Sequence, residues 1–216
     1  MNAICLSIPL EKNILLPPLL ERISSKNPNL VEYRLDNLSD RSALNIVADA
    51  KTCQIIGTDK SSRDASSGIL FDAVKVGFDY VDIDLSIASV NTIQKLKDLG
   101  GGVIISHHNL TGTPSEERLL AILRSEMDLG GDICKIVTRA THPNDNLTLL
   151  KFVGDNSQRT RIVSFAMGKL GIPSRVLSPI FGAEFTFASL DNQLSTAEGQ
   201  LSIDSLRNAW SILGIS

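Results

Sequence analysis

Short apolar segments with the character of buried β-strands recur through this chain of 216 residues about every 23–30 residues. Near-continuous apolar runs of this length are typical of buried parallel strands. We predict eight strands, over residues 3–8, 30–36, 53–58, 80–84, 103–108, 131–137, 161–165 and 183–187. Helices are predicted near 12–24, 40–51, 69–76 and 88–98, from 113–115 to 130, from 143 onward, and over 202–213. This alternation of strand and helix is the βα signature of a parallel sheet.

Eight such units in a chain of this length predict a (β/α)8 TIM barrel, with residues 1–216 forming a single catalytic domain. The alternative is an open, doubly wound sheet. A dinucleotide-binding sheet of that kind carries GxGxxG after its first strand, where this chain reads Ser7-Ile8-Pro9-Leu10. No phosphate-binding loop of the Walker type occurs either. We therefore expect the barrel.

The composition argues against several classes of function. The net charge is −3 and no cluster of Lys and Arg stands out, which disfavours nucleic acid and anionic membranes as partners. No apolar run approaches the roughly 20 residues of a membrane span, and residues 1–9 do not resemble a signal peptide. Three scattered cysteines, Cys5, Cys53 and Cys134, fit neither a disulfide framework nor a CxxC metal site. We expect buried thiols in a cytoplasmic protein.

One lysine interrupts the strand at 131–137. Lys135 lies in the middle of this otherwise apolar run. A buried lysine is costly unless its charge is paired or its amine is neutral. A desolvated lysine with a lowered pKa attacks carbonyl groups and forms a Schiff base. The alternative is a strand end whose lysine extends out to water.

Further polar side chains stand where other strands end, and the active site of a barrel lies at those carboxyl ends. Glu32 and Arg34 are two residues apart and therefore share one face of their strand, either as site residues or as a structural ion pair. Asp82 and Asp84 share a face in the same way.

The three histidines also follow strands. His107 and His108 are adjacent, so only one of them faces the mouth of the barrel, and the strand pattern does not say which. His142 is expected in a solvated loop. The alternative for each is a purely structural side chain. No HxH or HxxxH spacing with a nearby carboxylate occurs, so we assign no metal.

Two segments near the carboxyl end of the chain are predicted as loops with possible roles in binding. Residues 167–175 follow the seventh strand and end in Arg175, whose guanidinium can clamp a carboxylate through two hydrogen bonds. Residues 196–200 follow the eighth strand and can form a polar lid over the mouth. Either segment can equally be an ordinary loop.

Taken in order, these residues resemble the type I 3-dehydroquinate dehydratase family from Ser7 to Gln200. The resemblance rests on segments 31–36, 80–83, 106–108, 113–114, 132–136, 167–168, 174–175, 181–182, 186–187 and 199–200. It implies a (β/α)8 barrel in the shikimate pathway of aromatic amino acid biosynthesis. The family's enzymes are hydro-lyases that convert 3-dehydroquinate to 3-dehydroshikimate without a cofactor, and they are often dimeric. We accordingly expect a homodimer.

The resemblance also implies roles for individual residues. Lys135 forms the imine with the C3 ketone of 3-dehydroquinate, and His108 removes the C2 proton and returns one to the departing C1 hydroxyl in a syn elimination. Glu32 helps to position this histidine and the substrate, and Asp82 orients the histidine. Imidazole suits both proton transfers because its pKa lies near neutrality.

The remaining implied roles concern substrate contact. Arg175 matches the clamp for the substrate carboxylate, and Met167 and Phe187 wall the site with apolar surface that favours a neutral lysine amine. Further contacts with the substrate are expected from Ser7, Arg34, Lys60, Thr196 and Gln200.

The chain departs from the family pattern at several positions. Lys60 stands where an arginine is usual and keeps the charge without the planar fork. Asp64 replaces a longer glutamate that supports the site, and Asn109 replaces the aspartate after the histidine. The lid reads Thr-Ala-Glu-Gly-Gln over 196–200 instead of Ser-Ala-Pro-Gly-Gln, and the lost proline is expected to loosen it.

Two rival functions compete with the dehydratase. A class I aldolase barrel shares the lysine on a strand, but not the Glu-x-Arg-x-Asp run at 32–36 or the Ser-x-His run at 106–108. A barrel that only binds a small acid is the second rival. Lys135, His108 and Arg175 argue against it, because a barrel without chemistry has no reason to retain a buried lysine.

Overall fold

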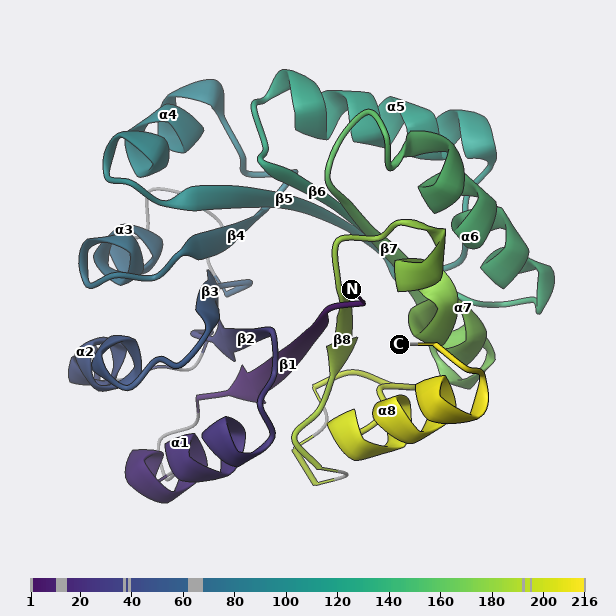
Figure 1. Cartoon of the computed structure of the whole chain (residues 1–216). Coiled ribbons are helices and arrows are strands. Elements are labelled where there is room, and N and C mark those ends of the chain that lie inside the picture. The colour runs from purple at the N-terminus through teal and green to yellow at the C-terminus, as the bar shows by residue number, and fades with distance from the viewer. Residues whose placement is uncertain are drawn as a thin grey trace.

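The structure is a computed structural model that describes residues 2–10, 15–36, 38, 40–61, 68–191, 193–194 and 196–215. Within these residues eight parallel strands stand in a ring, and helices cover the outside (Figure 1). The fold is the predicted (β/α)8 TIM barrel. The strands are β1 (Ile4–Pro9), β2 (Leu30–Arg34), β3 (Gln54–Thr58), β4 (Tyr80–Asp84), β5 (Gly102–Asn109), β6 (Ile133–Arg139), β7 (Ile162–Met167) and β8 (Thr186–Ala188).

The strands form one sheet in the order β7-β6-β5-β4-β3-β2-β1-β8. All of the paired strands run parallel, as successive βα units require. Between β7 and β8 the ring is joined more loosely, through a bond of 2.8 Å from the Glu184 amide to the Ile162 carbonyl. The carboxyl ends of the strands therefore meet at one end of a nearly closed barrel.

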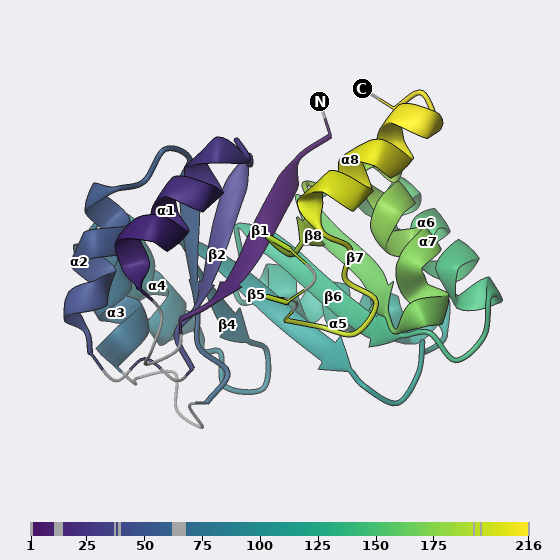
Figure 2. The same ribbon diagram turned by 90° about the horizontal axis from the view of Figure 1, so that it is seen from below.

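The helices of the described chain alternate with the strands (Figure 2). They are α1 (Leu16–Ser25), α2 (Ser42–Asp49), α3 (Gly68–Lys75), α4 (Val90–Asp98), α5 (Glu116–Asp128), α6 (Asn144–Asn156), α7 (Ile172–Leu177) and α8 (Ile203–Ile212), with short 3₁₀ turns η1 (Lys169–Gly171) and η2 (Ser178–Phe181) flanking α7. The predicted loop over 167–175 is thus wrong in part, since it contains η1 and the start of α7. A helix of 6 residues is too short to display a helical period in the sequence.

Several helices begin at the signals that the sequence carries. Pro17 and Pro18 stand in the first turn of α1. The Ser115 hydroxyl accepts the Arg118 amide at the start of α5, and the Asp40 carboxylate accepts the Ser42 amide before α2 at 2.9 Å. These contacts satisfy amides that a helix start leaves without an intrahelical partner.

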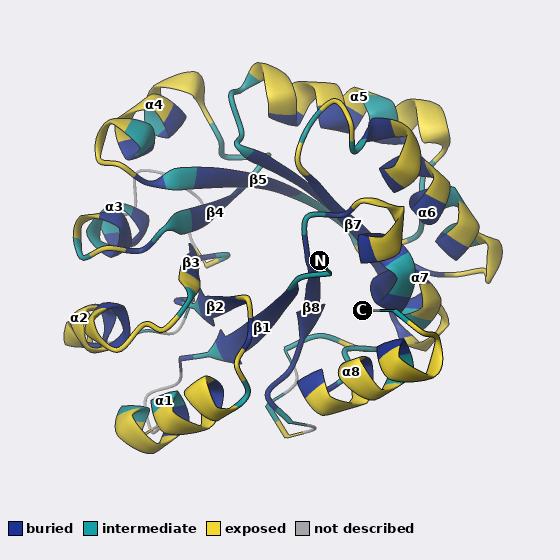
Figure 3. Cartoon of the chain, in the orientation of Figure 1, coloured by how far each residue is buried: buried dark blue, intermediate teal, exposed yellow. Residues whose placement is uncertain are grey.

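Alternate strand residues divide the core into two layers. Side chains that point into the barrel form one apolar cluster, which includes Cys5, Ile56, Ile104 and Val163. Side chains that point outward pack beneath the helices in two larger clusters. The strands and the inner faces of the helices are accordingly buried, while the outer faces are exposed (Figure 3). This packing fixes which face of each strand can supply a site.

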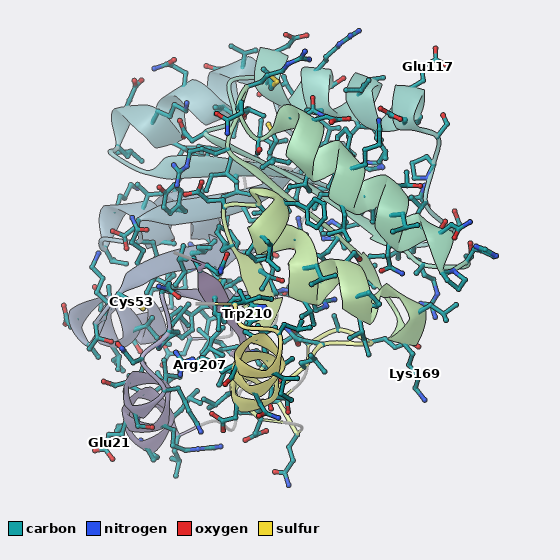
Figure 4. All side chains as sticks on the ribbon, turned by 45° about the vertical axis from the view of Figure 1, so that its right-hand side comes forward. Glu21, Cys53, Glu117, Lys169, Arg207 and Trp210 are labelled. Atoms are coloured by element: carbon teal, nitrogen blue, oxygen red, sulfur yellow. The ribbon has the colours of Figure 1, made fainter. Side chains whose placement is uncertain are left out.

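The short helix α7 is anchored by three neighbouring elements, α6, β8 and α8. Trp210 of α8 donates its indole N–H to the Val176 carbonyl at 2.8 Å, and Trp210 is labelled in Figure 4. Thr186 of β8 donates its hydroxyl to the Arg175 carbonyl at 2.7 Å. The Ser174 amide donates to the Asn146 side chain of α6 at 2.9 Å. These bonds hold the backbone of Arg175 in one place.

The cysteines are free thiols, and Cys5 and Cys134 are buried as predicted. Cys53 is only half-buried, because it precedes β3 at the edge of the barrel. None of the described helices has the length and apolar character that crossing a bilayer requires.

A carboxyl group is buried between α5 and the sheet. Glu126 is 0% exposed, and neither of its carboxyl oxygens has a well-formed hydrogen bond among the described residues. Burial, reinforced by the negative charges of Asp82 and Asp84, raises the pKa of Glu126 from 4.5 to about 10. Glu126 is therefore protonated at neutral pH.

This carboxyl makes the stability of the fold depend on pH. Because the pKa of Glu126 is raised in the folded state, its contribution to the free energy of unfolding is complete below about pH 4.5. That contribution is lost as pH rises toward about 10. The limiting slope is about 1.4 kcal/mol per pH unit. In urea unfolding at pH 5 and pH 8, we expect Glu126→Gln to lose less stability between the two pH values than the wild type. The control Glu117→Gln changes an exposed carboxylate of the same helix, and equal pH dependence in all three proteins would contradict the prediction.

Candidate active site

A cavity of about 330 Å³ opens at the carboxyl ends of the strands. It brings together the predicted side chains Ser7, Glu32, Arg34, Lys60, His108, Lys135, Met167, Arg175, Phe187, Thr196 and Gln200. Asp82 is completely buried beside Lys135, below the cavity. Asp64 lies outside the described residues. The cavity is therefore the candidate active site.

Lys135 is buried in the wall of this cavity as a charged group. Its Nζ lies 2.8 Å from Oδ2 of Asp82 and 3.4 Å from Oε1 of Glu32. The same nitrogen lies 4.4 Å from the centroid of the Phe187 ring. Burial by itself lowers the pKa of Lys135, but the two carboxylates outweigh it and raise the pKa above its usual value. The expected neutral amine is thus wrong for this substrate-free site, and the Phe187 ring also favours the cation.

Glu32 is fixed from both neighbouring strands. It accepts hydrogen bonds from the hydroxyls of Ser7 on β1 at 2.5 Å and Thr58 on β3 at 2.9 Å. Ser7 in turn accepts a bond from the Thr196 hydroxyl at 2.9 Å. Among the described residues, the remaining partner of Glu32 is Lys135 and not His108. Ser7 therefore holds Glu32 in place, and the supporting role of Thr58 was missed although it faces the barrel interior with Ile56.

Asp82 is shared between two lysines. Its Oδ2 accepts from Lys135, and its Oδ1 accepts from Lys60 at 2.8 Å and from the Ser106 hydroxyl at 2.6 Å. Burial by itself raises the pKa of Asp82, but the two ammonium groups outweigh it and hold the pKa far below its usual value. Within the described residues, no hydrogen bond joins Asp82 to His108. Asp82 therefore contacts the two lysines and not the histidine that it was predicted to orient.

The two adjacent histidines of β5 face opposite sides. His108 lines the cavity with Lys135, whereas His107 does not. Burial, then the positive charges of Lys135 and Lys60, lowers the pKa of His108 to about 3. The ring is therefore neutral at physiological pH, but the pKa near neutrality that was expected of this imidazole is not found in the substrate-free site. His142 is exposed in the loop after β6, as predicted.

Arg34 is paired with a carboxylate of its own segment. Its Nε donates to Oδ2 of Asp36 at 2.7 Å, and Asp36 also accepts the backbone amide of Lys60. The alternative of a structural ion pair between Glu32 and Arg34 is therefore not what the structure contains. Asp36 positions both cationic residues of this side of the cavity, and the sequence signal for it was its place in the Glu-x-Arg-x-Asp run.

Arg175 contributes a buried guanidinium to the opposite wall. It is 1% exposed and lies with its guanidinium carbon 4.2 Å from the centroid of the Phe165 ring. Its Nε and Nη2 have no hydrogen-bond partner among the described residues. Burial lowers the pKa of Arg175 to about 10, so the group is still charged at neutral pH. Donors of this kind are suited to a carboxylate.

Residues 196–200 lie at the rim of the cavity. The Thr196 amide donates to Oε1 of Gln200 at 2.9 Å, and the Thr196 hydroxyl oxygen lies 3.1 Å from the same atom. Glu198, which replaces the usual proline, pairs with Arg139 of β6 at 2.7 Å. Gly199 has a φ of +76°, and a Cβ there would collide with the backbone of Gly168. The segment is therefore held to the end of β6 by an ion pair and to the end of β7 by close backbone packing.

Comparisons with known proteins agree on one family. The family model described as type I 3-dehydroquinase matches residues 4–216. A 3-dehydroquinate dehydratase of Methanocaldococcus jannaschii is 31% identical over 198 residues, covering 87% of this chain and 88% of that protein. A 3-dehydroquinate dehydratase of Dehalococcoides mccartyi is 35% identical over 147 residues. This match covers 68% of this chain and 66% of that protein, which is just under two thirds of its length. The crystal structure of a 3-dehydroquinate dehydratase from Geobacillus kaustophilus superposes with a TM-score of 0.89 and 26% sequence identity. The match covers 99% of this chain and 91% of that chain.

Proposed function

This chain belongs to the type I 3-dehydroquinase family of hydro-lyases, and from that premise we propose that it dehydrates 3-dehydroquinate to 3-dehydroshikimate through an imine on Lys135. The observation that carries the proposal is Lys135 itself, buried in the wall of a cavity in contact with two carboxylates, Glu32 and Asp82. A neutral histidine and an unpaired guanidinium face the same cavity. These are the groups that imine formation, proton abstraction and carboxylate binding require.

The substrate is proposed to enter with its carboxylate on Arg175. The free Nε and Nη2 donors of that side chain can make two charge-assisted hydrogen bonds to it. Arg34, Thr196 and Gln200 line the cavity and are proposed to contact the hydroxyl groups, while Met167 and Phe187 line it and are proposed to pack against the ring. In this proposed orientation the C3 ketone lies at Lys135.

Imine formation begins with loss of a proton from Lys135. Glu32 can accept it, since it contacts the ammonium group, whereas the two lysines keep Asp82 ionised. The neutral amine then adds to C3, and the ketone oxygen leaves as water, which produces a protonated imine. The positive nitrogen draws electrons from the adjacent C2–H bond and acidifies that proton.

Elimination then proceeds through His108. Its neutral ring removes the C2 proton and gives an enamine. The enamine expels the C1 hydroxyl as His108 returns the proton, so that water leaves and the protonated imine is restored. Water hydrolyses this imine, which releases 3-dehydroshikimate and the Lys135 amine.

Trapping the imine tests this mechanism. We expect incubation with 3-dehydroquinate followed by borohydride to add one reduced substrate molecule, with peptide mapping placing it on Lys135. A protein that turns over the substrate without any adduct would contradict the covalent route. A folded protein that neither forms an adduct nor dehydrates the substrate would favour an aldolase or a binding barrel.

Replacing Arg175 with methionine is expected to weaken substrate binding while it raises the thermal stability of the protein. The variant loses both unpaired donors, and two charge-assisted bonds of about 1.5 kcal/mol each correspond to a KM about 100-fold higher. It also removes a buried charge whose Nε and Nη2 lack a hydrogen-bond partner among the described residues, so the midpoint of thermal unfolding should rise. Steady-state kinetics and differential scanning calorimetry measure the two effects. An unchanged KM would contradict the carboxylate clamp.

We further propose that the protein is a cytoplasmic homodimer and that residues 1–216 act as one catalytic domain. Free thiols support a reducing compartment. Exposed apolar side chains, Leu147 on α6 and Leu170 on η1, support contact with a second copy. Sedimentation equilibrium checks the dimer, and a single monomeric species would contradict it.

A further inference from the structure

Lys60 is bonded into the carboxylate cluster that surrounds the proposed nucleophile. Its Nζ lies 2.8 Å from Oδ1 of Asp82 and 2.5 Å from the Ser106 hydroxyl. Oδ2 of Asp84 lies 3.9 Å away. An ammonium group has three donors, so two of them are already engaged inside the protein. Lys60 is therefore poorly placed to act mainly as the substrate contact that its position in the sequence implies.

The two lysines compete for one carboxylate. Lys60 occupies Oδ1 of Asp82, and Lys135 occupies Oδ2 of the same group. Asp82 is 0% exposed, so solvent screens the three charges little. Each ammonium group thus weakens the hold of Asp82 on the other and also repels it directly.

We propose that Lys60 is a positioning residue that acts through Asp82 to determine how readily Lys135 gives up its proton. The inference rests on the proposed function, in which Lys135 must become a neutral amine before it attacks. With Lys60 in place, two ammonium groups balance Glu32 and Asp82. Without it, the cluster carries an excess negative charge that holds the proton on Lys135.

The other groups around Lys135 do not replace this charge. Glu32 from β2 is negative, and the buried thiol of Cys5 on β1 and the ring of His108 on β5 are neutral at physiological pH. Arg34 is already paired with Asp36, and the nearest group of β8 is the Phe187 ring. Among the described residues, Lys60 is the cation that shares a carboxylate with Lys135.

The backbone also fixes Lys60 in this position. Its amide donates to Asp36, which follows β2, so the residue is held at the point where β3 ends. Only 21% of the Lys60 side chain is exposed. The compact ammonium group of lysine fits between Asp82 and Ser106, and an arginine would place a larger planar group there.

The test measures the reactivity of Lys135 without substrate. Cyanate carbamylates neutral amines, so its rate at one fixed pH reports the neutral fraction of each lysine after peptide mapping. We expect Lys60→Met to slow carbamylation of Lys135 at pH 9 about tenfold, the effect of one pKa unit from one neighbouring charge. Lys60→Arg should recover most of the rate. The exposed Lys169 in the same digest serves as the internal control (Figure 4).

Kinetics separate this role from substrate contact. We expect Lys60→Met to lower kcat at neutral pH about tenfold and to regain activity as pH rises, with KM changed little. An unchanged carbamylation rate in Lys60→Met would overturn the proposal, whether or not KM rises. If Lys60→Met does not fold, Lys60→Gln gives the same comparison. Carbamylation needs no substrate. If the wild type failed to form the borohydride adduct, the proposed function would be refuted, but the carbamylation rates would still show whether Lys60 controls the reactivity of Lys135.

Discussion

Lys135→Met is expected to reduce dehydration of 3-dehydroquinate by about 10⁴-fold or more, the scale reached when a covalent nucleophile is removed. The physical reason is that no other described lysine lies in the cavity except Lys60, whose ammonium is bonded to Asp82 and Ser106. Without an imine, the C2 proton is acidified only by the ketone. The measurement is the initial rate of enone formation by ultraviolet absorbance, together with loss of the borohydride adduct.

The same substitution should leave the barrel folded. Asp82 keeps its bonds to Lys60 and Ser106, and Glu32 keeps its bonds to the hydroxyls of Ser7 and Thr58. Neither buried carboxylate is left without a partner, which is the usual cause of large losses when one member of an ion pair is removed. A Lys135→Met protein with the circular dichroism of the wild type and turnover within about tenfold of it would refute the role of Lys135 as nucleophile.

The barrel was predictable because its cause is local. Each strand needs only a short apolar run and each helix a capping residue or a glycine, and these signals stand in the sequence in order. The one missed helix, α7, is held by distant partners, Trp210 and Thr186, rather than by its own sequence. Such tertiary anchors leave no periodic signal.

For the site, the sequence predicted which residues line the cavity but not how they contact one another. Strand alternation and the family pattern select residues that do line the cavity, such as Lys135 and Arg175. They do not reveal the hydrogen bonds among them, because Lys135 and Asp82 are 53 positions apart and meet only when β4 and β6 pair with β5 in the sheet. The neutral amine was expected from the apolar strand and from the apolar walls implied for Met167 and Phe187. The charged amine follows from Asp82 and Glu32, which the strand sequence of Lys135 does not contain.

His108→Ala is expected to lower kcat by about 10²–10⁴-fold, the usual contribution of a general base, while His107→Ala changes it by less than about tenfold. His108 lines the cavity with Lys135, and its lowered pKa leaves the ring unprotonated, as an acceptor for the C2 proton must be. His107 points to the other face of β5 and does not line the cavity. Steady-state rates of the two purified variants provide the ranking, and the reverse order would mean that the wrong histidine had been assigned.

The reaction step at which the His108→Ala variant stops distinguishes a general base from a structural residue. Imine formation uses Lys135 and its carboxylates, so it should proceed, while removal of the C2 proton should not. We therefore expect substrate to accumulate as an imine on Lys135, seen as a mass loss of one water from the sum of protein and substrate before any reductant is added. His107→Ala should show no such accumulation. A His108→Ala protein that is slow and forms no imine would indicate that His108 acts earlier, in binding or in formation of the imine, and would contradict its assignment as the base for C2.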